Sequence, residues 1–373
     1  MSPPKRSILI VGAGPTGLTA AIELARRGYS PRIVDKDSGP AAESRALGIN
    51  PRTLAILAPS GVSAPLIAAG TKVRAAQFHT ATRDLFRIDI AAVGGRYPFI
   101  LMLPQSEVET ILVEVLVGFG INVEWQTELL SLEPGDTGVA VQLGRAAAPT
   151  EIVRADIVIG ADGAHSRVRK CVGLDFSGSA YETEWGLADC IVDSDLARET
   201  VHAFDLAPVL FAMLPIRWPL VRFFSDQADV LGHVPPAIKV MEVRWRTTFR
   251  ISHRQVENYQ KGPVFLAGDA AHIHSPVGGR GMNLGIEDAA WLAWLIDEGQ
   301  TARYTAERWP VGRQVLRTVD PATRLLSSDD PLPRALRRNL LPLALRVPAI
   351  RRRALRRLTA LDTPAPPWLS ASA

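Results

Sequence analysis

A glycine-rich turn near the N-terminus constrains the fold of this chain more than any other feature. The mainly apolar residues 7–11 are followed by Gly12-Ala-Gly14-Pro-Thr-Gly17 and then by a helix-forming stretch over 18–27. In such a strand–turn–helix unit, the first glycine permits the tight turn, the second lets the backbone approach a pyrophosphate, and the third lets helix and strand pack closely. The N–H groups and the dipole of the helix N-terminus then face the phosphates.

A second predicted strand, over 29–34, ends in Asp35, at the distance from the glycines that dinucleotide-binding units show. A carboxylate at this position can accept hydrogen bonds from an adenosine ribose. Strand, glycine turn, helix and acid together predict a βαβ unit that binds an ADP-containing dinucleotide. These residues alone do not distinguish FAD from NAD.

Composition limits the class of protein. A chain of 373 residues is long enough for about two domains, and 47% hydrophobic with 21% charged residues is ordinary for a globular protein. The net charge of +4 is too small to favour a nucleic-acid partner. Cys171 and Cys190 have neither CxxC spacing nor the count of a disulfide framework, which favours free thiols in a reducing compartment. Since no long apolar stretch is free of charge, we expect no membrane insertion and a cytoplasmic location.

Further elements follow from the periodicity of apolar residues. Residues 174–260 contain scattered aromatic residues, apolar runs and proline breaks, which predict an antiparallel sheet with loops. The chain then returns to a buried strand over 264–267, so the dinucleotide-binding domain is expected to be discontinuous. The other predicted elements are helices over 51–57, 105–117 and 284–297, strands over 121–125 and 139–143 in a β-meander, and one buried strand over 152–159.

Three separated motifs now occur in order: the N-terminal glycine turn, Asp162-Gly163 and Gly268-Asp269. In this order and spacing they resemble the FAD-dependent class A aromatic monooxygenases, the para-hydroxybenzoate hydroxylase family, and in particular its phenol- and polyketide-hydroxylating branch. The resemblance covers roughly residues 7–300. It implies an α/β fold: a Rossmann-like FAD-binding domain of the GR2 type with an inserted antiparallel β-sheet substrate domain and C-terminal helices.

The resemblance also implies how the chain is divided between the two domains. The expected segments are 1–75 and 101–173 for the first two parts of the FAD-binding domain, 76–100 for the first strands of the substrate domain, 174–262 for its main part, 263–300 for the flavin-ring loop and its helix, and 301–373 for a C-terminal helical region.

Residues that match the family's motifs have implied roles toward FAD. Gly12, Gly14 and Gly17 would bind the pyrophosphate, and Asp35 would bind the adenosine ribose. The remaining expected contacts are Arg45 on the pyrophosphate side, Gln105 near the ribityl chain, Asp162 and Gly163 in the motif associated with both FAD and NAD(P)H, and Asp269 on the ribityl chain.

The segment 276–283 would wrap the isoalloxazine ring. Its closely spaced glycines make a backbone that can lie flat against a planar ring, and the helix that follows directs its positive end at whatever the loop holds. The expected ring contacts are Pro276, Gly278, Gly279, Gly281, Met282 and Asn283.

Arg280 and Pro276 are the candidates for tuning the flavin. A reduced flavin carries negative charge, which the helix dipole and Arg280 would both stabilise. The family more often has an uncharged residue at the position of Arg280, and we expect Arg280→Gln to lower the flavin reduction potential. The sequence identifies no side chain as the catalytic base.

The activity implied by the resemblance is hydroxylation of an aromatic, phenolic or polyketide-type small molecule. NAD(P)H, as co-substrate, would reduce FAD, and O2 would add to form a C4a-hydroperoxide that transfers oxygen. The alternatives are the same fold catalysing Baeyer–Villiger oxidation, epoxidation or dehydrogenation in secondary metabolism, and a non-catalytic flavin-binding partner protein. We expect a monomer or homodimer.

Several residues have a structural as well as a functional interpretation. His272 and His274 have no third ligand at a suitable spacing, so a metal site is disfavoured. The arginine-rich stretch 333–358 is expected to form short helices packed on the body with solvated arginines, rather than a membrane-binding helix. The residues that would either line a substrate pocket or form the core of the second sheet are Phe211, Met213, Leu214, Phe223 and Phe224.

Overall fold

A computed structural model describes residues 6–42, 46–146, 148–206, 209–276, 278–328 and 330–370. Its first layer is a six-stranded sheet in the order β18-β19-β12-β1-β2-β8, parallel except for the edge strand β18. The central strands are buried along their whole length because helices cover the sheet. The bounds are β1 (Ile8–Val11), β2 (Arg32–Val34), β8 (Val123–Glu124), β12 (Ile157–Gly160), β18 (Gln260–Lys261) and β19 (Val264–Leu266).

The helices of this domain agree with the periodicity of the sequence. Helix α1 packs against both α4 and α6. The helix predicted over 284–297 begins three residues earlier, at Gly281, with Arg280 as its N-cap residue. The bounds are α1 (Pro15–Arg26), α2 (Pro51–Leu57), α3 (Ser63–Ala69), α4 (Gln105–Gly118), α5 (Arg167–Cys171) and α6 (Gly281–Asp297), with short helical turns η1 (Ala58–Ser60) and η4 (Gly268–Ala270).

The prediction of a single strand over 152–159 was wrong. The chain forms two strands there, because Asp156 lies between them and its carboxylate accepts hydrogen bonds from the N–H and the hydroxyl of Ser7 at 2.7 and 2.9 Å. The second strand is β12, and the first joins a separate three-stranded sheet whose strands are β9 (Thr127–Gly135), β10 (Gly138–Arg145) and β11 (Glu151–Ala155). The predicted β-meander is therefore β9–β11, and β8 belongs to the parallel sheet instead.

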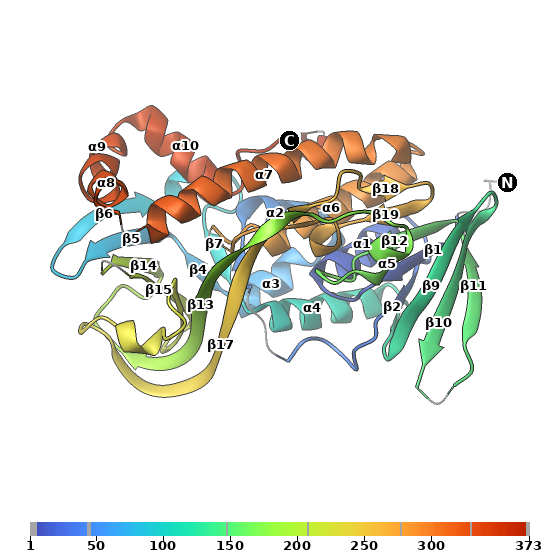
Figure 1. Ribbon diagram of the computed structural model, residues 1–373, viewed down its shortest axis with the longest axis horizontal. Helices are drawn as coiled ribbons and strands as arrows, with labels where there is room; N and C mark the ends of the chain where they lie inside the picture. The colour runs from blue at the N-terminus through green and yellow to red at the C-terminus, as the bar shows by residue number, and fades with distance from the viewer. Residues whose placement is uncertain are drawn as a thin grey trace.

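The expected antiparallel sheet is confirmed as eight strands in the order β20-β17-β13-β16-β15-β14-β5-β6, with one parallel pair, β14 and β5. The long strands β13 and β17 curve away from the parallel sheet, and α7 runs along the opposite side of the molecule (Figure 1). The bounds are β5 (Ala75–Thr80), β6 (Asp84–Asp89), β13 (Ser177–Asp193), β14 (Thr200–Asp205), β15 (Leu210–Arg217), β16 (Leu220–Ser225), β17 (Lys239–Gln255) and β20 (His272–Ile273), with turns η2 (Ile90–Val93) and η3 (Leu231–His233).

A small three-stranded sheet lies between the two large ones. It consists of β3 (Gly48–Ile49), β7 (Ile100–Met102) and β4 (Thr71–Val73), and β15 contacts both β4 and β7. Its Ile100 and Met102 form a hydrophobic cluster with Ile216 of β15. This cluster fixes the second domain against the first.

The C-terminal region is helical. Its elements are η5 (Thr301–Arg303), α7 (Tyr304–Ser327), α8 (Pro331–Ala335), a π-helical turn η6 (Leu336–Leu340), α9 (Leu341–Ala344), α10 (Pro348–Leu358) and α11 (Pro367–Ser370). Among the described residues, no helix is both long enough and apolar enough to span a bilayer.

The expectation that the C-terminal arginines are all solvated was wrong for Arg337. This residue is only 6% exposed, and its Nε donates to Asp205 Oδ2 at 2.9 Å. The neighbouring Arg338 donates to the same oxygen at 2.8 Å. Burial alone would raise the pKa of Asp205, but the hydrogen bonds from the two arginines outweigh it and lower the pKa to about 2. This pair of contacts joins the C-terminal helices to β14.

We expect Asp205→Asn to lower the free energy of unfolding at neutral pH by about 2 kcal/mol, the typical worth of a hydrogen bond to a charged group. Since the folded pKa of about 2 lies below the ordinary value of 3.8, the contribution of Asp205 is full above pH 4 and is lost as the pH falls through about 2. Urea unfolding at several pH values measures this, with the exposed Asp136→Asn as control. A stability difference that is the same at pH 3 and pH 7 would contradict it.

Candidate functional site

The three motifs found in the sequence meet at one edge of the parallel sheet. The glycine turn follows β1, Asp162-Gly163 follow β12, and Gly268-Asp269 follow β19. These three strands are neighbours, and hydrogen bonds join the chain just beyond them, from Ala161 N to the carbonyl of Val11 at 2.8 Å and from Ala267 N to that of Gly160 at 3.0 Å. The carboxyl ends of parallel strands are where ligands bind in open α/β sheets.

The geometry around the glycine turn distinguishes the three glycines. A Cβ on Gly12, whose φ is +105°, would lie 2.4 Å from the carbonyl oxygen of Ala161, and a Cβ on Gly17 would lie 1.9 Å from that of Gly12. Neither position therefore tolerates a side chain. A Cβ on Gly14 would meet no atom of the described residues within 4 Å. The structure thus leaves open space at the glycine where a pyrophosphate would approach the backbone.

Asp35 lies beside this turn. Its Oδ2 accepts a hydrogen bond from Ala13 N at 2.6 Å, and its Oδ1 accepts one from Asp37 N at 2.9 Å. A carboxylate has about four acceptor positions, so two remain for ribose hydroxyls. Asp35 therefore holds the glycine turn and can also bind a ligand.

Asp162 lies in the turn between β12 and the short helix α5, whose N-cap residue is Ser166. Its carboxylate accepts hydrogen bonds from Ser166 Oγ at 2.5 Å and from the N–H groups of Arg167 and Val168 at 2.6 and 3.0 Å. Burial raises the pKa of Asp162, and these hydrogen bonds oppose the increase. The adjacent Gly163 has a φ of +74° and open space where a Cβ would stand. The hydrogen bonds of Asp162 therefore fix the turn, and the described residues leave space beside Gly163.

Arg169 links the second motif to the third. Its Nη2 donates to the carbonyl of Ala164 and its Nη1 to the carbonyl of Ala270, both at 2.9 Å. The guanidinium also lies over the ring of Phe176, 3.9 Å from its centroid. Sequence analysis missed this residue, although an arginine six residues after Gly163, next to the apolar Val168, was a signal that a partner is needed.

The Gly268-Asp269 turn is exposed at Asp269 and buried at Gly268. It is supported from behind by Asp288 of α6, whose Oδ2 accepts a hydrogen bond from His272 Nε2 at 2.5 Å and lies 3.4 Å from Gly268 N. The Oδ1 of Asp288 accepts from Arg308 Nε at 2.7 Å. His272 is therefore part of a buried ionic network.

This network was not predicted. Arg308 is fully buried between two carboxylates, and its Nη1 donates to Glu287 Oε1 at 2.6 Å. Burial lowers the pKa of Arg308, but the charges of Glu287 and Asp288 outweigh it and raise the pKa. Two adjacent acids within an otherwise apolar helix were the available signal, since buried charges require partners. The nearby His274 donates a hydrogen bond from Nδ1 to the carbonyl of Ser275 at 2.9 Å.

The loop expected to wrap the flavin ring leads directly into α6. Pro276, Gly278 and Gly279 are exposed, while Met282 is half-buried and Gly281 opens the helix. Asn283 is buried and lies at the centre of four hydrogen bonds that hold the loop against α2 and β3. Its Oδ1 accepts from Asn50 N at 2.8 Å and Thr53 Oγ1 at 2.7 Å, and its Nδ2 donates to the carbonyls of Gly48 at 2.8 Å and Gly279 at 2.7 Å.

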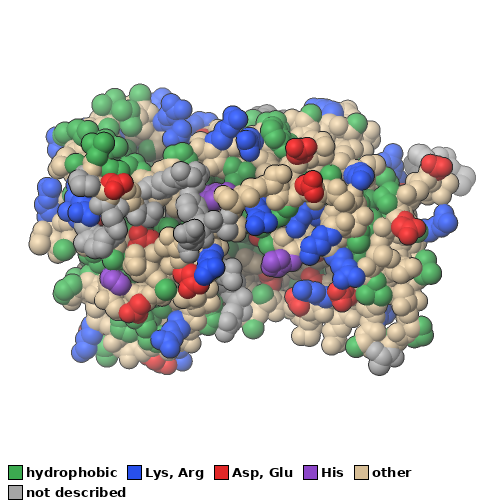
Figure 2. Space-filling view, in the orientation of Figure 1, with side chains coloured by type: hydrophobic (Ala, Val, Ile, Leu, Met, Phe, Trp, Pro, Cys, Tyr) green, Lys and Arg blue, Asp and Glu red, His purple; other side chains and the backbone are tan. Residues whose placement is uncertain are grey.

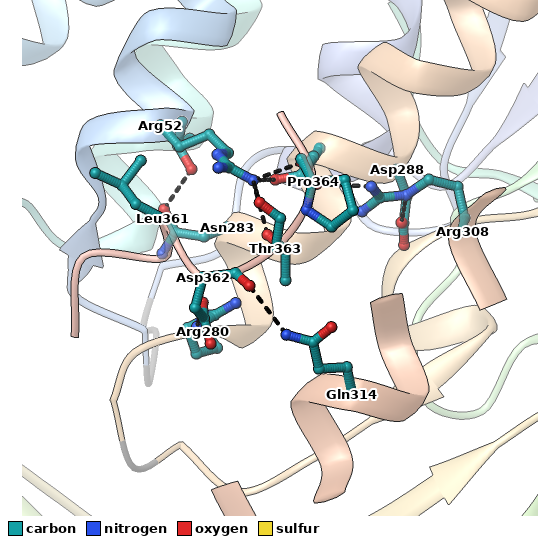
Figure 3. A network of polar contacts seen from close by, with 12 residues as sticks. Arg52, Arg280, Asn283, Asp288, Arg308, Gln314, Leu361, Asp362, Thr363 and Pro364 are labelled. Carbon is teal, nitrogen blue, oxygen red and sulfur yellow. Dashed lines mark hydrogen bonds and ion pairs between the residues drawn. The ribbon is translucent and has the colours of Figure 1, made fainter. Parts of the chain in front are cut away.

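Arg280 points toward the C-terminal segment. Its Nη1 donates to Asp362 Oδ1 at 2.8 Å and to the carbonyl of Arg357 at 3.1 Å. Figure 3 shows residues 361–364 lying between α2, α6 and α7, with Gln314 of α7 donating to the carbonyl of Asp362 at 3.0 Å. The charge of Arg280 is therefore paired with a carboxylate 82 residues further along the chain, which sequence analysis did not foresee.

Gln105 begins α4 and donates from Nε2 to Glu109 Oε1 at 2.8 Å. The other oxygen of Glu109 accepts a hydrogen bond from Ala41 N at 2.8 Å, which ties the segment after β2 to the helix. Burial raises the pKa of Glu109, and the hydrogen bond from Gln105 opposes the increase. Arg45, expected on the pyrophosphate side, lies outside the described residues.

Comparisons with known proteins agree with this geometry. Residues 5–216 and 227–319 match the family described as FAD binding domain. The chain is 36% identical over 370 residues to 6-methylpretetramide 4-monooxygenase from Streptomyces rimosus, and 33% identical over 338 residues to pentachlorophenol 4-monooxygenase from Sphingobium chlorophenolicum. These alignments cover 91% and 83% of this chain but only 64% and 63% of the two relatives, so the chain spans less than two thirds of their length.

A solved structure shows the same arrangement of domains. The anhydrotetracycline hydroxylase from Streptomyces rimosus aligns with a TM-score of 0.79 and 28% identity, over 97% of this chain and 77% of that protein. Membership of one family of FAD-binding proteins therefore explains the glycine turn, the two aspartate motifs and the inserted antiparallel sheet together. The chain belongs to the FAD binding domain family, and FAD is its cofactor.

Proposed function

We propose that this protein is an FAD-dependent monooxygenase that uses NAD(P)H and O2 to hydroxylate an aromatic, phenolic or polyketide-type small molecule. The observation that carries the proposal is the convergence of three cofactor motifs at the carboxyl ends of β1, β12 and β19, next to an antiparallel sheet. The printed activities of the relatives, which include monooxygenases for a pretetramide and a chlorophenol, support the substrate class.

The bound flavin supplies the redox and oxygen-transfer chemistry, and the protein supplies position, electrostatics and exclusion of water. Gly12 and Gly14 bind the pyrophosphate at the N-terminus of α1, with Asp35 on the ribose. Asp269, whose side chain is exposed on its turn, binds the ribityl chain. The loop that leads into α6 would hold the ring, and the hydrogen bonds of Asn283 fix that loop against α2 and β3.

The substrate is proposed to bind against one face of the eight-stranded sheet. Leu214 of β15 pairs with Arg222 of β16, and the side chains of cross-strand partners lie on the same face of a sheet. Phe224 lies two residues after Arg222 on the same strand, so its side chain shares this face with Leu214. Leu214 packs on the cluster of Ile100 and Met102, so this face points toward the FAD-binding domain. Phe224 is half-buried there.

Two of the residues that the sequence suggested for the substrate pocket lie on the other face of the sheet and belong to a separate hydrophobic core. Met213 pairs with Phe223, and both lie, with Phe211, in a hydrophobic cluster that Val230 and Ile238 cover. The pocket interpretation is therefore kept for Phe224 and Leu214 only. Beside Phe224 lie Trp185 and Phe249, at ring-centroid distances of 5.0 and 6.4 Å.

We expect Phe224→Ala to raise the KM for a phenolic substrate roughly tenfold while FAD affinity is unchanged, because it removes one apolar wall of the pocket. Steady-state kinetics and flavin fluorescence measure the two quantities. The adjacent Phe223→Ala is the control. Phe223 is fully buried in the other core, so its loss is expected to cost about 3–5 kcal/mol of stability without a selective effect on KM. Equal KM effects in both variants would contradict the assignment of the face.

The charge of Arg280 can be tested together with that of its partner. We expect Arg280→Gln to lower the flavin reduction potential and Asp362→Asn to raise it, since the second change removes the negative charge that balances the guanidinium. An interaction of about 0.5–1 kcal/mol between the side-chain charge and the reduced flavin corresponds to a change in reduction potential of roughly 10–20 mV for a two-electron couple. Spectroelectrochemical titration measures it. Shifts of the same sign in both variants would show that the loop has moved and that charge is not the cause.

Rapid mixing tests the activity itself. Anaerobically reduced protein is mixed with oxygenated buffer, and the near-ultraviolet absorbance is followed with and without phenolic compounds. We expect a transient species distinct from reduced and oxidised flavin, and a product heavier by one oxygen atom. Direct return to the oxidised spectrum with every aromatic compound would favour a dehydrogenase or a non-catalytic flavoprotein.

A further inference from the structure

The C-terminal helices carry an unusual concentration of positive charge. Residues 331–361 contain nine arginines and no aspartate, glutamate or lysine, although the whole chain has a net charge of only +4. Figure 2 shows Lys and Arg side chains along the upper edge of the molecule, over α10 and α7. A charge excess of this size on one short segment needs a physical explanation, because like charges repel within a folded protein.

Four of these arginines face one cleft between α7 and α10. The cleft has a volume of about 380 Å³, within the range of small-molecule sites. Its lining residues are Gln314, Thr318, Ala349, Arg352, Arg353, Arg356, Arg357 and Asp362.

The spacing along α10 explains why these four converge. Arg352 and Arg356 are four residues apart, as are Arg353 and Arg357, so the two pairs form adjacent columns on one helix face. Like charges at this spacing destabilise an isolated helix. The arrangement therefore costs stability unless something negative lies between the columns.

The protein supplies little negative charge of its own here. Across the part of the chain that the structure describes, no ion pair joins any of these four arginines to a carboxylate. The nearest acid, Asp362, lines the cleft, but its Oδ1 already accepts from Arg280 at 2.8 Å. Among the described residues, the guanidinium of Arg356 donates to the carbonyl of Leu361 and to no carboxylate. The guanidinium groups are left to bind a ligand.

We propose that this cleft binds a phosphate-bearing ligand outside the FAD site. Guanidinium groups bind phosphate oxygens in a planar, bidentate manner, and two adjacent columns of arginines match the several oxygens of a pyrophosphate or phosphomonoester. The amide of Gln314 and the hydroxyl of Thr318 on α7 provide uncharged polar groups on the opposite wall. Since the cleft adjoins the Arg280–Asp362 contact, the ligand would bind next to the loop that leads into α6.

The test measures binding of inorganic pyrophosphate to the FAD-loaded protein by calorimetry at constant ionic strength. We expect Arg352→Gln/Arg356→Gln to weaken the affinity roughly a hundredfold, about tenfold for each bidentate contact removed. Arg351→Gln is the matched control, because Arg351 is an exposed arginine on the same helix that does not line the cleft. Its affinity should equal that of the unchanged protein.

Thermal unfolding separates loss of the site from loss of the fold. Without pyrophosphate, the double variant should unfold at the same temperature as the unchanged protein or higher, since a repulsion has been removed. With pyrophosphate, only the unchanged protein and Arg351→Gln should be stabilised. Absence of binding, or an equal loss of affinity in Arg351→Gln, would overturn the proposal and leave only diffuse charge attraction.

Competition then identifies the source of the phosphate. Displacement of pyrophosphate by NADPH but not NADH would indicate the 2′-phosphate of the nucleotide. Displacement by phosphatidylglycerol vesicles, but not by phosphatidylcholine vesicles, would indicate a lipid headgroup. Displacement by neither would leave a free phosphate compound as the ligand, and each of these results supports the site.

Discussion

Replacing Gly14 by valine is expected to abolish FAD binding and leave the protein folded. Gly14 has φ and ψ of −73° and −178°, which any residue adopts, and a Cβ there would have no neighbour within 4 Å in the part of the chain that the structure describes. A valine side chain would therefore fill only the space that the pyrophosphate needs. Because it removes the close approach of phosphate to the N-terminus of α1, we expect FAD affinity to fall by at least a hundredfold, or about 3 kcal/mol.

Gly17→Ala provides the contrast. Its Cβ would lie 1.9 Å from the carbonyl oxygen of Gly12, so α1 and β1 must move apart, and stability should fall together with FAD affinity. Flavin fluorescence titration and urea unfolding of the apoprotein distinguish the two cases. If Gly14→Val lost stability as severely as Gly17→Ala, the open space at Gly14 would not be a ligand site.

Local signals in the sequence were sufficient for the cofactor-binding half of the fold. The glycine turn, its flanking strand and helix, and α2 and α4 were all predicted from periodicity and turn chemistry, because these elements are determined by residues close together in the chain. The sequence predicted that the inserted domain forms an antiparallel sheet, but it did not predict which residues pair between the strands. The faces on which Phe223 and Phe224 lie could therefore be distinguished only from the pairing of β15 with β16.

The contacts that the sequence did not indicate have one property in common. Each joins residues that lie far apart in the chain. Asp156 ends a strand because it binds Ser7, 149 residues earlier. Arg280 was expected to stabilise the reduced flavin, and the sequence did not indicate that Asp362 accepts a hydrogen bond from its guanidinium. Arg337 is buried because Asp205 on β14 accepts its hydrogen bond. In each case the residue type indicated that a partner was needed, and only the tertiary structure identifies it.

The buried network behind the Gly268-Asp269 turn leads to the largest expected effect on stability. Asp288 is 1% exposed and Arg308 is fully buried. Removing the carboxylate in Asp288→Ala leaves the guanidinium with Glu287 as its partner in the network and removes the acceptor of His272. The expected loss is about 3–5 kcal/mol, typical of breaking a buried ion pair by deleting one member. FAD affinity should also fall, because Asp288 supports the turn that carries Asp269.

Replacing both members separates the two effects. Asp288→Leu/Arg308→Met removes both charges and fills much of their volume with apolar atoms, so it should be less destabilised than Asp288→Ala alone, as replacement of buried pairs often is. Its FAD affinity should remain low, since Gly268 and His272 still lack the carboxylate that positions them. Urea unfolding of the apoprotein and flavin titration measure both quantities. Additive losses of stability in the double variant would contradict the network, because independent sites add and coupled charges do not.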